Sequence, residues 1–226
     1  MNFVFDQQDQ EKEDRKMSDF MREKITIISA VVLMFLAGCA TVGTSFKTTE
    51  LDQLRLLEST ESDVIGYFGQ PFKKQARSEM GGEFQLLVYI YAIGTPNSGK
   101  SRRLATEFVE GKLNAYLFHS ALEGDMTNFD ASSRLKLVAE QSRKSDVINA
   151  LGKPHGEVVF PSVLLKNEFG SLPEVVPPNN AAMALVYNYV ETVRKKSLIT
   201  TQLKLVIAYL SDDGTVVEVR HFDGTL

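Results

Sequence analysis

The sequence contains a single cysteine, Cys39, and only three histidines. One thiol cannot form a disulfide within the chain, so the folded part must rely on its hydrophobic core. His119, His155 and His221 are scattered and lack the spacing of a metal site. Lys and Arg are spread along a chain of net charge -4 and form no basic stripe. We therefore expect no metal, no other cofactor and no nucleic-acid partner.

Motifs for covalent catalysis are also missing. No serine stands in a G-x-S-x-G sequence, the turn that exposes the nucleophile of α/β-hydrolases. We therefore expect a protein that is not an enzyme. One motif stands against this expectation, the sequence GTPNSGKS at residues 94–101.

The N-terminal part of the chain contains no hydrophobic run long enough to span a bilayer. Residues 1–20 are polar, which predicts a disordered extension, or they precede the true start, since Met17 and Met21 are alternative initiators. Residues 25–36 then form an apolar run of 12 residues behind two basic residues. This length is typical of a signal-peptide core and too short for a membrane-spanning helix.

The apolar run ends in Leu36-Ala37-Gly38-Cys39. These residues resemble the lipobox that signal peptidase II reads in bacterial lipoproteins, in which the cysteine thiol carries diacylglycerol. The resemblance implies a signal peptide over residues 21–38, lipidation of Cys39 and a linker over residues 39–49. The alternatives are an ordinary secretory signal with a chance cysteine, or a buried structural cysteine.

The expected location follows from the anchor. Two or three acyl chains hold a protein firmly on a membrane. By resemblance to the sorting rule of enterobacterial lipoproteins, Ala40 after the cysteine favours the periplasmic side of the outer membrane over the inner membrane or the cell surface.

The remaining chain contains a repeat. Residues 59–71, STESDVIGYFGQP, and residues 142–154, SRKSDVINALGKP, agree at seven of thirteen positions. Ser59 and Ser142 are expected to cap a helix, and Gly69 and Gly152 to end it. Further helices are expected upstream, at residues 50–57 and 133–140.

Strand patterns follow each marked helix. LVYIY at residues 87–91 matches LVYNY at residues 185–189, and each copy is expected to end in a hairpin. The hairpin strands are expected at residues 104–109, 113–119, 203–210 and 215–222. The sequence thus predicts an α+β fold of two tandem repeats, at residues 50–130 and 131–226, each a helix pair and a three-stranded antiparallel meander. Residues 155–182, with several prolines, are expected to be a loop insertion in the second repeat.

The stretch D-V-x-x-x-[FL]-G-x-P, at residues 63–71 and 146–154, resembles the BamE (SmpA/OmlA) lipoproteins and the beta-lactamase inhibitory protein (BLIP). The resemblance implies helix pairs packed on an antiparallel sheet. BamE has one copy where this chain has two, and the inhibitory protein has disulfides that this chain cannot form.

GTPNSGKS fits the P-loop pattern, but the residues around it do not. A P-loop requires a helix immediately after its final Ser or Thr, whereas the chain turns again at Gly111. The corresponding stretch of the second repeat, residues 190–201, lacks both glycines. We therefore expect a strand connection without bound nucleotide, and nucleotide binding stays an unfavoured alternative.

Basic residues mark this connection in both repeats. They are Lys100, Arg102 and Arg103 in the first and Arg194, Lys195 and Lys196 in the second. They are expected to be solvated loop charges or to contact lipid phosphates or an acidic protein surface.

Two tyrosines in each repeat stand two residues apart and so share a sheet face. These are Tyr89 and Tyr91, and Tyr187 and Tyr189. Such tyrosines either pack against the core or, by resemblance to the inhibitory protein, form a partner-binding face rimmed by the insertion. The leading hypothesis is a non-catalytic, lipid-anchored lipoprotein that binds an envelope protein in envelope assembly or maintenance. A lipid-binding or small-ligand-binding lipoprotein is a further alternative.

Overall fold

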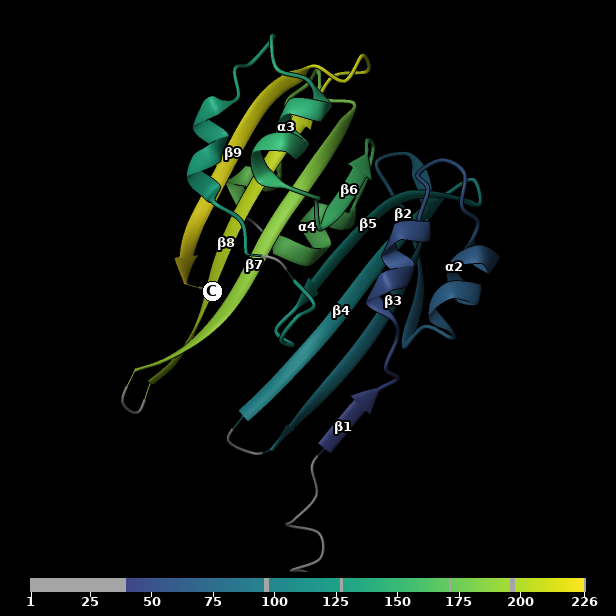
Figure 1. Cartoon of the computed structure of the whole chain (residues 1–226). Coiled ribbons are helices and arrows are strands. Elements are labelled where there is room, and N and C mark those ends of the chain that lie inside the picture. The colour runs from purple at the N-terminus through teal and green to yellow at the C-terminus, as the bar shows by residue number, and fades with distance from the viewer. Residues whose placement is uncertain (1–39, 96–97, 127, 171, 196–197, 226) are drawn as a thin grey trace, which may run out of the picture. The chain divides into compact units, whose positions relative to one another are not determined.

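The computed structural model describes residues 40–95, 98–126, 128–170, 172–195 and 198–225. Thr41–Leu226 form one compact unit. Its described residues have an α+β fold, in which a nine-stranded antiparallel sheet carries a few short helices (Figure 1). The predicted α+β class is confirmed.

The sheet contains strands from both repeats in one continuous order. The strands are β1 (Ala40–Gly43), β2 (Lys73–Glu79), β3 (Gly82–Thr95), β4 (Ser98–Val109), β5 (Lys112–Ser120), β6 (Gly156–Val159), β7 (Met183–Lys195), β8 (Leu198–Leu210) and β9 (Val216–Thr225). They lie in the order β1-β3-β4-β5-β6-β7-β8-β9, and β2 also pairs with β3. The helices are the 3-10 helices η1 (Thr48–Gln53), η2 (Ala131–Lys136) and η3 (Pro173–Val175) and the α-helices α2 (Glu61–Phe68), α3 (Lys144–Leu151) and α4 (Leu164–Phe169).

Each repeat contributes a fourth strand that the sequence did not predict. β2 and β6 follow the Gly-x-Pro ends of α2 and α3. β2 reads KKQARSE, a polar sequence without a strand signal, and forms by pairing with β3 across a turn at Met80 and Gly81, both of which have positive φ. β6 pairs with both β5 and β7, so the sheet runs unbroken from one repeat into the next.

Each marked helix begins one residue later than expected, after Thr60 and after Arg143. Thr60, rather than Ser59, caps α2, because its hydroxyl and backbone N–H pair with Asp63. Ser59 Oγ instead accepts the backbone N–H of Arg55 at 3.0 Å, and Ser142 Oγ accepts that of Val138 at 2.9 Å. The two serines therefore close the turn before each helix instead of capping it.

The predicted upstream helices are 3-10 helices, and they lie slightly earlier in the chain. η1 and η2 end before residues 57 and 140, where the backbone turns into the left-handed region. Leu57 and Glu140 both have a φ of 63°. The backbone is already extended at Leu54 and Leu137, the residues that follow η1 and η2, so the expected helices at residues 50–57 and 133–140 do not form.

The core has two layers, one on each face of the sheet. Leu86 and Leu87 are neighbours in β3 and point to opposite faces. Leu87 belongs to the apolar cluster beneath η1 and α2, and a matching cluster lies beneath η2 and α3. Leu86 belongs to a third cluster on the other face, which continues from the first repeat into the second. We call this second face the insertion face.

The insertion at residues 155–182 is not the irregular rim loop that its prolines suggested. It contains β6, α4 and η3. Val163, Leu164 and Leu165 are buried against sheet residues of both repeats, such as Ala105 and Leu203. The insertion therefore packs on the face of the sheet opposite η1, α2, η2 and α3.

The predicted linker at residues 39–49 is also ordered where it is described. β1 pairs with β3, and Phe46 is buried against Phe68, Tyr89 and Phe118. Gly43 lies so close to the Ile90 carbonyl that a Cβ would stand 1.9 Å from its oxygen. Only glycine fits this contact, so the start of the described chain is part of the folded unit.

Candidate functional site: the groove between the repeats

The groove lies where the sheet passes from the first repeat to the second. β6 is short and covers only Ala115, Tyr116 and Leu117 of β5. Next to Gly156, the backbone of His155 continues the link between β5 and β7. Its carbonyl accepts from Phe118 N, and its N–H donates to the Val186 carbonyl. The helices of the two repeats stay apart above this junction, which leaves a groove of about 310 Å³.

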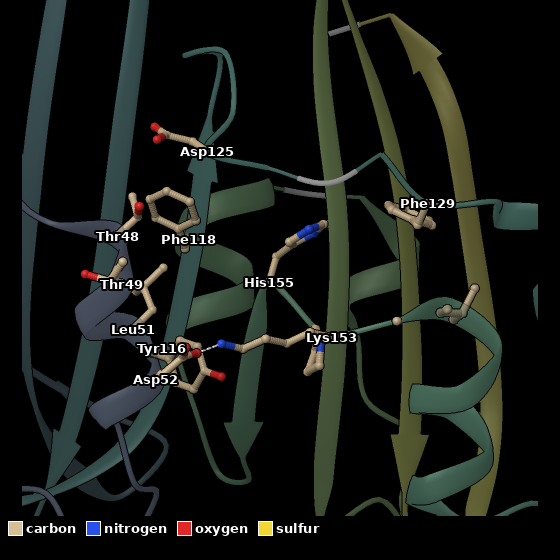
Figure 2. Close-up of a pocket in the computed structure, with 13 residues that line it drawn as sticks. Thr48, Thr49, Leu51, Asp52, Tyr116, Phe118, Asp125, Phe129, Lys153 and His155 are labelled. Carbon is tan, nitrogen blue, oxygen red and sulfur yellow. Dashed lines mark ion pairs between the residues drawn. The ribbon is translucent and has the colours of Figure 1, made fainter.

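Both repeats line the groove (Figure 2). Thr48, Thr49, Leu51 and Asp52 of η1 stand on one side, and residues 151–155 stand on the other. Tyr116 and Phe118 of β5 form its floor, and Asp125 and Phe129 of the connection between the repeats lie at one end. The groove thus has an aromatic floor and a polar rim.

An ion pair crosses the groove from one repeat to the other. Figure 2 shows the Lys153 ammonium extended toward the Asp52 carboxylate, with which it pairs. Both side chains are more than half exposed, so solvent screens the pair and it contributes little stability. A ligand could therefore open this contact at little cost and take over either charge.

His155 is held in a fixed orientation at the groove. Its Nδ1 accepts the backbone N–H of Asn188 at 3.1 Å, so this nitrogen carries no proton. Its ring packs near those of Phe129 and Tyr187, with centroids 6.1 and 6.3 Å away. The imidazole is thus a positioned part of the wall rather than a mobile surface group.

An ion pair between Arg102 and Asp125, both largely buried, lies at one end of the groove. Arg102 donates to both carboxylate oxygens of Asp125 at 2.7 and 2.6 Å and to the Phe46 carbonyl at 2.5 Å. Ser120 also donates to Asp125 at 2.6 Å. Arg102 is therefore no solvated tip charge. It ties β4 to the N-terminal segment and to the connection between the repeats.

Arg103, the next predicted tip residue, has a structural contact on the insertion face. It donates to Glu168 of α4 at 2.7 and 2.6 Å, and this bond raises the pKa of the guanidinium. Lys100 is exposed near the end of the β3–β4 hairpin. Arg194 and Lys195 end β7, and Lys196 lies outside the described residues. Arg102 and Arg103 are therefore each held by a different carboxylate and are not free hairpin charges.

The tyrosines lie on the helix-covered face. Tyr89 is 2% exposed and Tyr187 is fully buried, each within the apolar cluster beneath its helices. Direct contact of these two with a partner is therefore excluded in this structure, and the packing alternative describes them. Tyr91 and Tyr189 lie farther along the same face and are half-buried.

GTPNSGKS forms the end of a hairpin. Gly94 pairs with Gly99 and Thr95 with Ser98, while residues 96 and 97 lie outside the described residues. β4 continues directly from Ser98 to Val109, so a strand stands where a P-loop requires a helix. This geometry offers no helix N-terminus for a phosphate, which argues against the nucleotide alternative.

Other sites predicted from sequence are not reached by the structure. The lipobox, Leu36 to Gly38, and Cys39 lie outside the described residues. No helix among the described residues is both long and apolar enough to cross a membrane. Within the same residues no three His, Cys, Asp or Glu side chains lie close enough to hold a metal ion.

Sequence reasoning missed the groove and a buried polar site on the opposite face of the sheet. Asp52 and Lys153 belong to different repeats, and no local pattern pairs them. Glu107 and Asn114 are buried on the insertion face, where Asn114 Nδ2 donates to Glu107 Oε1 at 2.9 Å. Burial raises the pKa of Glu107. A Glu and an Asn inside strongly apolar strands were the one available signal for this site.

Comparisons with known proteins give one structural similarity. No protein-family model matches the chain, and no curated protein matches it in sequence. The fold is similar to the crystal structure of a candidate beta-lactamase inhibitor protein from Streptococcus mutans, with a TM-score of 0.43 and 8% identity. The match covers 79% of this chain and 98% of that one. Such a similarity says nothing about partners.

Proposed function

We propose that this protein is a non-catalytic lipoprotein, anchored through Cys39 on the periplasmic side of the outer membrane, that acts in the envelope by binding another protein. The single observation that carries the binding part is the groove between the repeats. Its rim offers the exposed charges of Asp52 and Lys153, and its floor is formed by Tyr116 and Phe118, which are 7% and 2% exposed. An aromatic centre with a polar rim is the composition of protein interfaces.

The way in which the two faces of the sheet are covered also favours the groove as the binding surface. The insertion covers one face across both repeats, and helices cover the other. The groove is where the two helix layers separate, and it carries the exposed charges of Asp52 and Lys153 on its rim. A protein segment that carries an apolar side chain and a neighbouring charge fits it better than a flat surface does.

The anchor rests on the sequence around Cys39. The test is metabolic labelling with palmitate, which is expected to enter the natural protein but not Cys39→Ser. Inhibition of signal peptidase II with globomycin is expected to leave an unprocessed precursor. Normal processing under globomycin together with unlabelled protein would refute the anchor.

The binding part is tested in native membranes with a photo-crosslinking amino acid at Thr49, on the groove wall, and at Asp212 as control. Both side chains are exposed, but Asp212 lies in the β8–β9 turn. A discrete crosslinked protein at Thr49, absent at Asp212 and lost when Asp52→Lys is added, is the expected result. The same product from both positions, or none from Thr49, would contradict groove binding.

A small polar ligand is the second candidate function, and one buried atom favours it. Asn188 is fully buried and donates to the Phe118 carbonyl, yet its Oδ1 has no hydrogen-bond partner among the described residues. It lines a cavity of about 360 Å³ on the insertion face together with His119 and Glu168. Native mass spectrometry of purified protein, with Asn188→Leu as comparison, would show a bound small molecule if this function holds.

A further inference from the structure

Two hairpins extend beyond the part of the sheet that the helices cover, both at the same end. β3 and β4 join there, and so do β7 and β8 (Figure 1). Burial falls along β3 toward this end: Tyr89 is buried, Tyr91 is half-buried and Ile93 is 37% exposed. A two-stranded ribbon outside a core is at most marginally stable in water. We therefore expect this extension to lie against another surface.

The N-terminal strand fixes where the chain enters this end. β2 occupies the outer edge of β3 up to Val88, so β1 can pair only with the later residues of β3. Gly43 lies against the Ile90 carbonyl. The residues before Gly43 therefore run beside the last residues of β3, toward the hairpin end.

The position of the anchor follows from covalent geometry, and this step rests on the proposed lipidation of Cys39. Cys39 is two residues before Thr41 in the sequence, and two residues span at most about 7 Å. No free linker intervenes, because Thr41 to Gly43 belong to β1. A lipid-bearing Cys39 therefore brings the bilayer to the hairpin end of the sheet.

We propose that the hairpin end is a membrane-contact surface, which orients the domain with the opposite turns away from the bilayer. The first repeat presents Val42 and Ile93, both exposed and apolar, and the exposed Lys100 opposite Ile93. This combination suits the interface, where apolar side chains enter the headgroup boundary and lysine meets lipid phosphate.

The second repeat gives this end a second point of contact. The β7–β8 hairpin has its backbone register at Arg194 with Ile199 and Lys195 with Leu198, so basic and apolar residue types again occur together at its end. β3 and β7 run in the same direction in an antiparallel sheet, which places both hairpins at one end. Two separated contacts fix a tilt that one anchor alone leaves open.

The experiment uses the full-length protein, processed in its host and reconstituted into vesicles of phosphatidylethanolamine and phosphatidylglycerol with nitroxide-labelled headgroups. An environment-sensitive thiol fluorophore is placed at Ile93→Cys or, as the matched control, at Glu83→Cys. Both lie on β3 and are about 33 Å apart along the strand. We expect several-fold stronger quenching at position 93 than at position 83.

A second variant tests the charge contact. Lys100→Glu in the Ile93→Cys background is expected to reduce quenching several-fold on vesicles with phosphatidylglycerol and much less on purely zwitterionic ones. Equal quenching at positions 93 and 83, or no response to Lys100→Glu, would overturn the membrane-contact surface.

The same samples separate this inference from the proposed anchor. A thioether-linked Cys39 cannot take up the fluorophore, and the acylated protein floats with the vesicles. If the otherwise natural protein becomes labelled at Cys39 and stays with the soluble fraction, the anchor itself fails. If it floats without label and positions 93 and 83 are quenched alike, only the orientation fails.

Discussion

The two buried tyrosines Tyr89 and Tyr187 occupy equivalent places in the repeats but differ at one atom. Tyr187 donates its hydroxyl to the Gly152 carbonyl at 3.0 Å. The Tyr89 hydroxyl is buried without a hydrogen-bond partner among the described residues, and burial, helped by Glu61, raises its pKa to about 12. Replacing each by Phe removes only the hydroxyl and leaves the ring contacts in place.

The two substitutions are therefore expected to change the free energy of unfolding in opposite directions. A hydrogen bond contributes about 1 kcal/mol net, so Tyr187→Phe should lower stability by roughly this amount. A buried polar group without a partner costs about 1–3 kcal/mol, so Tyr89→Phe should raise stability by about 1 kcal/mol or more. For a chain of this size the midpoint temperatures should move by about 2–4 °C each way.

Thermal unfolding followed by circular dichroism, with denaturant unfolding as a check, measures the difference. Tyr91→Phe is the control, since Tyr91 is only half-buried on the same strand. If Tyr89→Phe destabilises the protein as much as Tyr187→Phe does, the Tyr89 hydroxyl has a partner in solution and the comparison of the repeats fails.

Three further predictions concern the insertion face. Glu107→Ala removes the acceptor of the Val163 N–H and of Asn114 Nδ2, and it should lower the free energy of unfolding by about 2 kcal/mol. Hydrogen exchange in α4, measured by mass spectrometry, should become faster. Arg103→Ala leaves Glu168, with a side chain 6% exposed, without its ion-pair partner and should likewise loosen α4, whereas Lys100→Ala, at an exposed site, should not. Burial lowers the pKa of His119 below its ordinary 6.5, so as pH falls below 6.5 the unfolded state binds a proton before the folded state does, and the protein loses stability. His119→Gln should therefore make the free energy of unfolding, measured by denaturant titration, depend less on pH in this range.

The helices were predictable where their ends carry a local chemical mark. α2 ends at Gly69 and α3 at Gly152, both with positive φ, as the repeat indicated. The N-terminus of α3 was misplaced because its N-cap is Arg143, a residue type not favoured there. That of α2 was misplaced because Ser and Thr stand side by side at residues 59 and 60, and either can cap. Which of the two residues caps the helix depends on the turn before it. Leu57 has a left-handed conformation in that turn, which cannot be predicted from a leucine in the sequence.

The fourth strands and the covered face were not predictable for a different reason. β2 is polar and exists because β3 offers it an edge, and that contact is a property of the pair. The same limit applies to Tyr89 and Tyr187: a two-residue period says that side chains share a face, but not which layer covers it. Likewise Arg102 and Arg103 read as loop charges because Asp125 and Glu168, their partners, are distant in sequence.

The anchoring of the insertion bears directly on where a partner can bind. Glu107 holds its start through Val163, Arg103 holds its middle through Glu168, and Tyr209 donates to the Glu174 carbonyl at 2.6 Å near its end. These contacts come from strands of both repeats, so lifting the insertion would break all of them and expose a large apolar cluster. A partner that needed the insertion face would have to offset that cost, whereas one that enters the groove first meets the exposed Asp52–Lys153 pair, which opens at little cost. The geometry therefore favours recognition at the junction of the repeats, with the insertion acting as part of the core.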